Sequence, residues 1–378
     1  MDIKTAFDSN SDCQSAADKI YQGINQPGIK LVLVFSSPKY DSYQLMENLS
    51  ARFKNIRIAG CTTMGEITEA GFIREGIVAA SFAGDDIEVS AEVIAKLANF
   101  SAADALKAVQ NCSSDLGIPL DDLSSGHHFG ITLIDGLSGK EEAVISALAL
   151  AAPNIKIVGG SAGDDMELLN TFVFLNGEVH KNAAVFILFR CEAPFKVFNR
   201  HHFVPTENEI VVSKSHSGSR VIKEIDGLPA VTRYADLMEI GREDLDDNDI
   251  WQYPFGFEIE GRFYIRSILN TREESLLMAS AVNDGTVLTL MRPGDMLKDT
   301  KDLLSDLKTG LNGISFMILF NCFGRFAEAE MKNISDDIFD SLNVCPLIGF
   351  NTLGEQFCSL HINHSITGVA FGGAHAEK

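Results

Sequence analysis

The sequence is short of positive charge and of long apolar runs, and each shortage excludes a class of protein. Only 31 Lys and Arg stand against 52 Asp and Glu, which gives a formal net charge of −21. Such a surface repels phosphate backbones and anionic membranes, so we expect no nucleic-acid partner. The apolar stretches, such as residues 143–152, are too short to span a bilayer, so we expect no membrane insertion.

Cysteines are few, and a leader segment is missing from the sequence pattern. The seven cysteines are an odd number without a C-x-x-C pair, which fits a reducing compartment better than a disulfide framework. The first residues contain no basic region followed by an apolar run, so we expect no signal peptide. We therefore predict a cytoplasmic protein whose acidic surface favours docking on a basic protein surface.

What the sequence does contain is one pattern that occurs three times, over residues 30–82, 129–189 and 314–371. Each copy has an apolar strand, a helix, a short strand with glycine, an elbow of the form hydroxyl–x–Gly–acid, and further strands. This predicts a mixed α+β or α/β fold, with repeated β-α-β-β units that form layered mixed sheets flanked by helices. The elbow residues are Thr63, Gly65 and Glu66; Ser161, Gly163 and Asp164; and Thr352, Gly354 and Glu355.

The elbows allow two interpretations. Glycine permits a positive φ or a close backbone approach, and the hydroxyl and carboxylate can satisfy N–H groups of the bend. The elbows then only shape the fold. Loops at strand ends also commonly carry function, so the elbows could instead line a ligand pocket. The residues between the second and third copies do not follow this pattern. We predict a boundary there between two domains, residues 28–218 and residues 219–373.

Two catalytic or phosphate-binding patterns are incomplete. Residues 159–163 match G-x-S-x-G, which would make Ser161 the nucleophile of an esterase-like hydrolase. The stretch 164–170 is too short for the helix that this motif requires, so a hydrolase that uses Ser161 is the least favoured alternative. Residues 136–140 precede a helix, but their spacing fails the P-loop pattern.

Histidines form three clusters, His127-His128, His201-His202 and His361-x-x-His364. Adjacent residues on a strand face opposite sides, and so do residues three apart, so neither spacing chelates zinc easily. A single proximal imidazole suffices for haem iron. The alternative for each histidine is an ordinary surface or core-edge position.

Several separated motifs resemble one family. The segments IAGCTTMGEI, LIDGLSGKEE and IVGGSAGDD resemble the FIST N-terminal domain, here residues 28–218. The segments EIDGLPAVTRYADL, YPFGF, FNCFGR, IGFNTLGEQF and HINHSITGVAFG resemble the FIST C-terminal domain, here residues 219–373. The resemblance implies a signal-input protein that binds a small ligand, so we predict a sensor and not an enzyme.

A finer resemblance concerns the NosP-type branch of this family. His201-His202-Phe203, together with Gly354–Phe357 and His361-x-Asn363, is similar to that branch. It implies haem, nitric oxide sensing and a partner histidine kinase in two-component or cyclic-di-GMP signalling. The implied haem residues are His202 as iron ligand, with His201, Phe203 and His361. The alternative is a sensor of an amino acid or other metabolite, whose carboxylate the elbow N–H groups would cradle.

Overall fold

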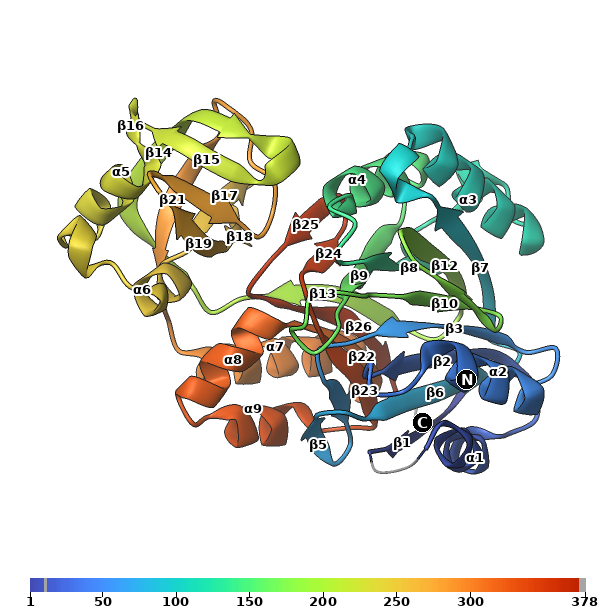
Figure 1. The fold of residues 1–378 in the computed structure, drawn as a ribbon. Coiled ribbons are helices and arrows are strands. Elements are labelled where there is room, and N and C mark those ends of the chain that lie inside the picture. The colour runs from blue at the N-terminus through green and yellow to red at the C-terminus, as the bar shows by residue number, and fades with distance from the viewer. Residues whose placement is uncertain (10–11, 374–378) are drawn as a thin grey trace.

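A computed structural model describes residues 1–9 and 12–373, and three six-stranded sheets within it follow one plan (Figure 1). Repeat 1 comprises β1 (Asp2–Asp8), α1 (Cys13–Ile24), β2 (Ile29–Ser36), α2 (Ser42–Arg52), β3 (Arg57–Thr62), β4 (Glu66–Thr68), β5 (Gly71–Ile73) and β6 (Ile77–Ala83). Repeat 2 comprises β7 (Ile87–Ala95), α3 (Ala102–Asp115), β8 (His128–Asp135), α4 (Glu141–Ala151), β9 (Lys156–Ala162), β10 (Val173–Leu175), β11 (Glu178–His180) and β12 (Ala183–Cys191). Repeat 3 comprises β13 (Phe195–Arg200), α7 (Met296–Leu311), β22 (Ile314–Cys322), α8 (Phe323–Met331), α9 (Ser335–Leu342), β23 (Leu347–Thr352), β24 (Glu355–Phe357), β25 (Leu360–Ile362) and β26 (Ile366–Gly372).

The apolar runs form the central strands of these sheets. β2, β8 and β22 each pair in parallel with the short strand that follows, β3, β9 and β23. Strands that are buried on both faces read as continuous apolar runs, which explains stretches such as KLVLVF. The mixed α+β fold with repeated β-α-β-β units, which the sequence predicts, is confirmed.

The repeats exchange their hairpins around a ring. β10–β11 of repeat 2 extends the sheet of repeat 1 at β3, and β24–β25 of repeat 3 extends that of repeat 2 at β9. β4–β5 of repeat 1 closes the ring on β23. Each of the three six-stranded sheets therefore includes a hairpin from another repeat.

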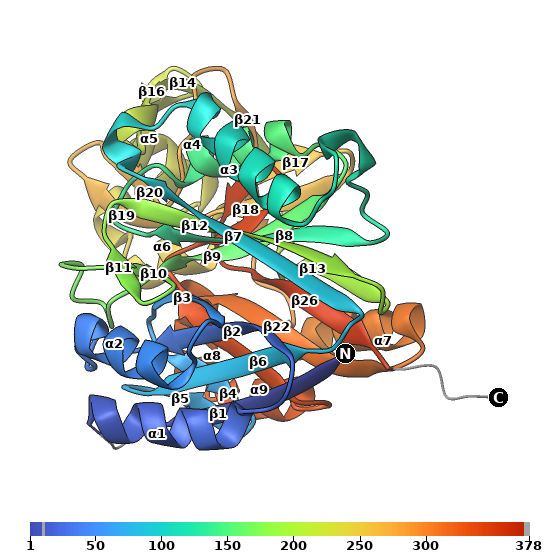
Figure 2. The same cartoon turned by 90° about the vertical axis from the view of Figure 1, so that its right-hand side faces the viewer.

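The three sheets face a common core and carry their helices outside. Phenylalanines from different sheets meet there, for example Phe35 with Phe350 at 4.6 Å between ring centroids and Phe82 with Phe316 at 5.7 Å. Separate apolar clusters join α1 and α2 to the outer face of repeat 1 and α3 and α4 to that of repeat 2 (Figure 2). This leaves the elbows together at one end of the ring.

Repeat 3 is interrupted between β13 and α7 by residues 204–292, here called the inserted unit, which form a separate lobe in Figure 1. Its sheet has the order β18-β17-β21-β14-β15-β20-β19, with β16 paired to β15. Its elements are β14 (Val204–His216), β15 (Val221–Ile225), β16 (Leu228–Pro229), α5 (Ala230–Leu237), α6 (Asp247–Gln252), β17 (Phe255–Ile259), β18 (Arg262–Arg266), β19 (Ile268–Arg272), β20 (Ser275–Met278) and β21 (Val287–Arg292). Strand pairing does not define units that fold independently, so the division into residues 28–218 and 219–373 stays a prediction.

Among the residues that the structure describes, no helix is both long and apolar enough to cross a bilayer.

Candidate functional site

The three elbows bond to one another through their backbones. Met64 N donates to Asn351 O at 3.0 Å, Leu353 N to Ser161 O at 3.2 Å, and Gly163 N to Thr62 O at 3.0 Å. Each elbow thus bonds to the short strand of another repeat. These N–H groups already have acceptors. They are therefore not free to bind the carboxylate of a ligand, as the amino-acid sensor alternative requires.

Two elbows carry the same buried hydroxyl–acid pair. Thr63 Oγ1 donates to Glu66 Oε1 at 2.5 Å, and Thr352 bonds to Glu355 in the same way. The second oxygen of Glu66 accepts from Gly76 N at 2.9 Å, and that of Glu355 accepts from Ser365 Oγ at 2.8 Å. Burial raises the pKa of both carboxyls to about 8, so both are largely protonated at neutral pH. These acids therefore stabilise the elbows from inside.

The two elbow glycines have different roles. Gly65 has a φ of +105°, in the region that favours glycine. Gly354 lies instead against His361, whose ring an added Cβ would overlap. The positive φ explains Gly65, and a close approach explains Gly354 and also Gly163 of the second elbow, whose added Cβ would overlap Met64.

The second elbow is built differently. Asp164 accepts from the backbone N–H groups of Leu168, Leu169 and Asn170 at 2.6 to 2.9 Å and so closes a loop rather than pairing with a hydroxyl. Ser161 is fully buried, and its Oγ accepts from Gln356 Nε2 at 2.8 Å. No helix follows it, because the chain continues through this loop to β10. Ser161 is therefore not displayed as a nucleophile elbow requires.

A cavity of about 310 Å³ lies where the ring meets the inserted unit. Its ring side comes from the carboxyl ends of β8 and β22, two elbows, the loop after the second elbow and the β25–β26 turn. Its other side comes from the inserted unit. The lining residues are Met64, Gly136, Leu137, Glu141, Met166, Leu168, Arg220, Trp251, Ser267, Ile268, Leu269, Ala279, Cys322, Phe323, Gly324, Thr352, Leu353, Asn363 and His364.

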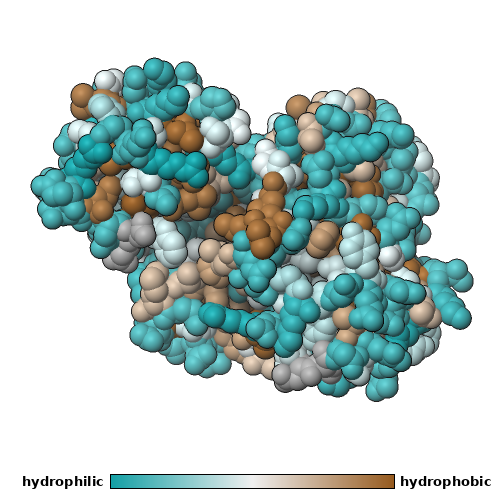
Figure 3. Space-filling view, viewed as in Figure 1, coloured by the Kyte–Doolittle hydropathy of each residue, from teal (hydrophilic) through white to brown (hydrophobic). Residues whose placement is uncertain are grey.

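The cavity is mainly apolar, and its mouth is too. Leu137, Met166, Leu168 and Leu269 line it and are also exposed. Figure 3 shows a hollow between the lobes with apolar residues gathered beside it. Met166 and Leu168 have positive φ values of 70° and 55°, a conformation that is rare for such side chains and clusters at ligand clamps.

Two polar side chains in this lining lack partners. Asn363 is 1 % exposed, and neither Nδ2 nor Oδ1 has a hydrogen-bond partner among the described residues. The Oγ of Ser267 is likewise buried without a partner in this part of the chain. An unsatisfied buried polar group costs about 1–3 kcal/mol, so native proteins seldom keep one without a reason.

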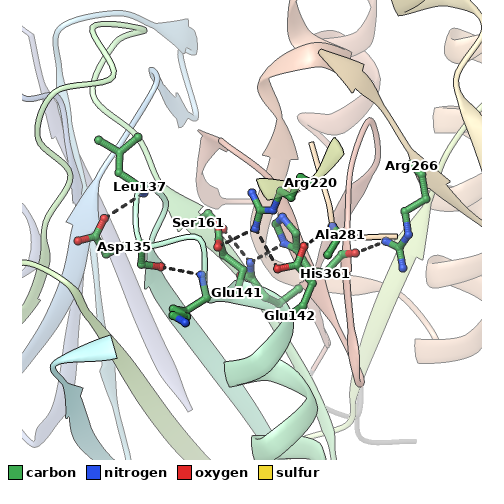
Figure 4. A network of polar contacts seen from close by, with 12 residues as sticks. Asp135, Leu137, Glu141, Glu142, Ser161, Arg220, Arg266, Ala281 and His361 are labelled. Atoms are coloured by element: carbon green, nitrogen blue, oxygen red, sulfur yellow. Dashed lines mark hydrogen bonds and ion pairs between the residues drawn. The ribbon is translucent and has the colours of Figure 1, made fainter. Parts of the chain in front are cut away.

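An ion network joins the inserted unit to α4 (Figure 4). Arg220 Nη2 donates to Glu141 Oε2 at 2.8 Å and to Glu142 Oε2 at 2.9 Å, and Ala281 N donates to Glu142 Oε1 at 2.7 Å. Burial raises the pKa of Glu141 to about 7. Although burial opposes it, the charges of His361 and Arg220 lower the pKa of Glu142 to about 2. This network fixes one wall of the cavity against the other.

A second buried cluster holds His202. Its Nε2 donates to Glu328 Oε1 at 3.0 Å, and His364 Nε2 donates to Glu328 Oε2 at 2.9 Å. Burial lowers the pKa of His202 to about 4, so its imidazole is neutral at pH 7. Burial opposes ionisation of Glu328, but the two histidine hydrogen bonds hold its pKa well below its ordinary value. His202 and His364 thus share the carboxylate of Glu328 as their acceptor.

The residues that the resemblance implies for haem do not converge on the cavity. The structure brings His202 and Phe203 together, with ring centroids 4.3 Å apart, but places His201 against Phe263 O and His361 against Gln356. The cavity lining includes none of these four residues. The described residues contain no group of three or more His, Cys, Asp or Glu arranged for a metal ion. The four residues implied for haem thus lie outside this cavity, and a haem held by them stays a prediction of the resemblance.

Of the elbow residues singled out in the sequence, Thr352 lines the cavity, but sequence reasoning missed most of the other lining residues. Asn363 and Glu141 lie inside quoted family segments, so those segments pointed to the right place without giving a role. Arg220, Trp251 and Ser267 belong to the inserted unit, and no periodicity or motif in the sequence relates them to the elbows.

The comparisons with known proteins agree with this organisation. Residues 30–228 match the family model of the FIST N domain, and residues 230–358 match that of the FIST C domain. A relative, the uncharacterized protein MJ1623 of Methanocaldococcus jannaschii, is 24% identical over 367 residues, which cover 87% of this chain and 70% of that protein. The FIST N match and the FIST C match each include residues of the ring and of the inserted unit.

Proposed function

Since this chain belongs to the FIST family of signal-transduction sensors, we propose that it binds its small ligand in the cavity between the elbows and the inserted unit. The observation that carries this proposal is Asn363, a buried amide that lines the cavity with both polar atoms unpartnered. Ligand pockets typically combine apolar walls with a few such polar groups, and about 310 Å³ lies at the small end of their range. The expected ligand is therefore compact.

Trp251 gives the direct test, because it is the chain's single Trp and it lines the cavity. We expect a ligand to shift Trp251 emission and to raise the melting temperature. In Ala279→Met the larger side chain fills the cavity, so both responses should weaken at least tenfold in ligand concentration. The measurement is a titration with excitation at the red edge of Trp absorption.

The matched control is Leu150→Met, since Leu150 is exposed on α4 and does not line the cavity. This variant should respond like the unmodified protein. If Ala279→Met bound the same ligands with unchanged affinity while remaining folded, the cavity would not be the binding site.

Haem stays a prediction of the resemblance, and an absorption spectrum tests it. Because His202 faces Glu328 rather than the cavity, we expect His202→Ala to leave the Soret band of the haem-reconstituted protein, with and without nitric oxide, unchanged. His364→Ala is the companion variant, since His364 does line the cavity. A Soret band that disappears in His202→Ala alone would instead assign His202 as the iron ligand.

We expect the sensor to act on a signalling partner. The resemblance implies that this partner is a histidine kinase. The net charge of −21 supports a partner with a basic docking surface, because complementary charge speeds association and selects the partner. This proposal requires an association rate that falls as salt is added.

A further inference from the structure

We infer that the ligand is a neutral molecule with a planar edge that carries a hydrogen-bond donor beside an acceptor, such as a primary carboxamide or lactam, on a compact apolar body. The inference rests on the proposed function, because it concerns the same cavity. It is carried by the chemistry of Asn363, by the balance of charge around it and by the apolar walls.

Asn363 specifies the edge. Its side chain holds a donor, Nδ2, next to an acceptor, Oδ1, and neither has a partner among the residues described. The donor and acceptor stay adjacent whichever way the amide is turned. A group that offers acceptor and donor side by side satisfies both atoms at once, as in the two-point contact of Asn with adenine. A carboxylate offers only acceptors and an amidinium only donors, so each leaves one atom unpaired.

The arginine that lines the cavity already has partners of opposite charge. Arg220 binds two carboxyl groups, Glu141 and Glu142. A carboxylate ligand would have to displace one of them from Arg220, and a cationic ligand would compete with Arg220 for both. Burying an unpaired charge costs far more than burying a neutral amide that is hydrogen-bonded.

The walls define the rest of the molecule. Met64, Leu353, Phe323 and Ile268 supply apolar surface, and Trp251 adds an aromatic face. Ser267 Oγ, which has no partner in the described chain, can bond to a second polar atom of the ligand. The polar edge is therefore expected at Asn363, with the apolar body against these walls.

Three isosteric probes separate the possible edges. Benzamide is neutral and has the donor–acceptor edge, benzoate is an anion with acceptors only, and benzamidine is a cation with donors only. We expect millimolar benzamide to shift Trp251 emission, with at least tenfold weaker responses to the other two. Asn363→Asp keeps the side-chain shape but removes the donor, so it should weaken benzamide at least tenfold and favour benzamidine.

The control is Asn208→Asp, which makes the same charge change at an exposed position. It should leave the probe order unchanged. Two results would contradict the donor–acceptor edge and leave the cavity as the proposed binding site. In one, benzoate or benzamidine shifts Trp251 emission as strongly as benzamide in the unmodified protein. In the other, Asn363→Asp leaves the order of the three probes unchanged. If no probe shifted Trp251 emission and Ala279→Met showed no loss for any other ligand, the edge and the proposed site would both be wrong.

Discussion

Gly60→Ala is expected to lower the free energy of unfolding by at least about 3 kcal/mol, because the new Cβ has no space. A Cβ on Gly60 would overlap the carbonyl oxygen of Val34, which belongs to the backbone of the neighbouring strand β2. A backbone oxygen cannot rotate away as a side chain can, so β2 and β3 must separate. The measurement is the urea midpoint of unfolding, with the soluble fraction after expression as a second readout.

The other repeats make the same close approach. An added Cβ at Gly159 would overlap the carbonyl oxygen of Thr132, and one at Gly349 would overlap that of Leu319. Gly126→Ala is the control, because nothing lies within 4 Å of its added Cβ. A Gly60→Ala protein that unfolded at the same urea concentration as Gly126→Ala would contradict this account of the short strands.

Stability is expected to fall between pH 6.5 and pH 8 because of Glu66 and Glu355. In the folded state their pKa is raised to about 8 from an ordinary 4.5, so the folded chain keeps protons that the unfolded chain releases. This contribution is complete below the ordinary pKa and is lost as pH rises through the folded pKa. Each group should then cost roughly 2 kcal/mol over this interval. The measurement is the free energy of unfolding in urea at several pH values.

The interval is chosen because the buried histidines act on the acid side. His202 and His361 have pKa values lowered to about 4 from 6.5, so they destabilise the fold as pH falls below 6.5 and add little above it. Glu66→Gln with Glu355→Gln removes both titrations and should flatten most of the curve between pH 6.5 and 8, leaving the smaller fall due to Glu141, whose pKa burial raises to about 7. Glu47→Gln, at an exposed position on α2, is the control. An equal loss of stability in the double variant and the control would refute the assignment.

The repeats were predictable because their central strands are apolar throughout. The apolar strand that the pattern predicts in each copy corresponds to β2, β8 and β22. The preceding strand and helix of each repeat lie outside the predicted pattern, and edge strands such as β13, FKVFNR, lack a continuous apolar run. The one helix that the pattern predicts in the third copy is two, α8 and α9, separated where Asn333 takes a φ of +54°.

The elbows were predictable as features but not as a site. Their glycines and acids are visible in sequence, yet Glu66, Ser161 and Glu355 turn inward while Met64, Thr352 and Leu353 reach the cavity. The cavity itself arises where the inserted unit meets the ring. Its ion pair joins Arg220 of the inserted unit to Glu141 of repeat 2, and no local pattern encodes such a long-range contact.

The exchange of hairpins has a consequence for the order of folding during synthesis. β4 pairs with β23, which leaves the ribosome roughly 280 residues later, or roughly 15 s to a minute at ordinary rates of translation. Until then the hairpin of repeat 1 has an unpaired edge, with Ile67 and Phe72 uncovered by repeat 3. The ring can close only near the end of translation, so the nascent chain must keep this edge from aggregating while it waits.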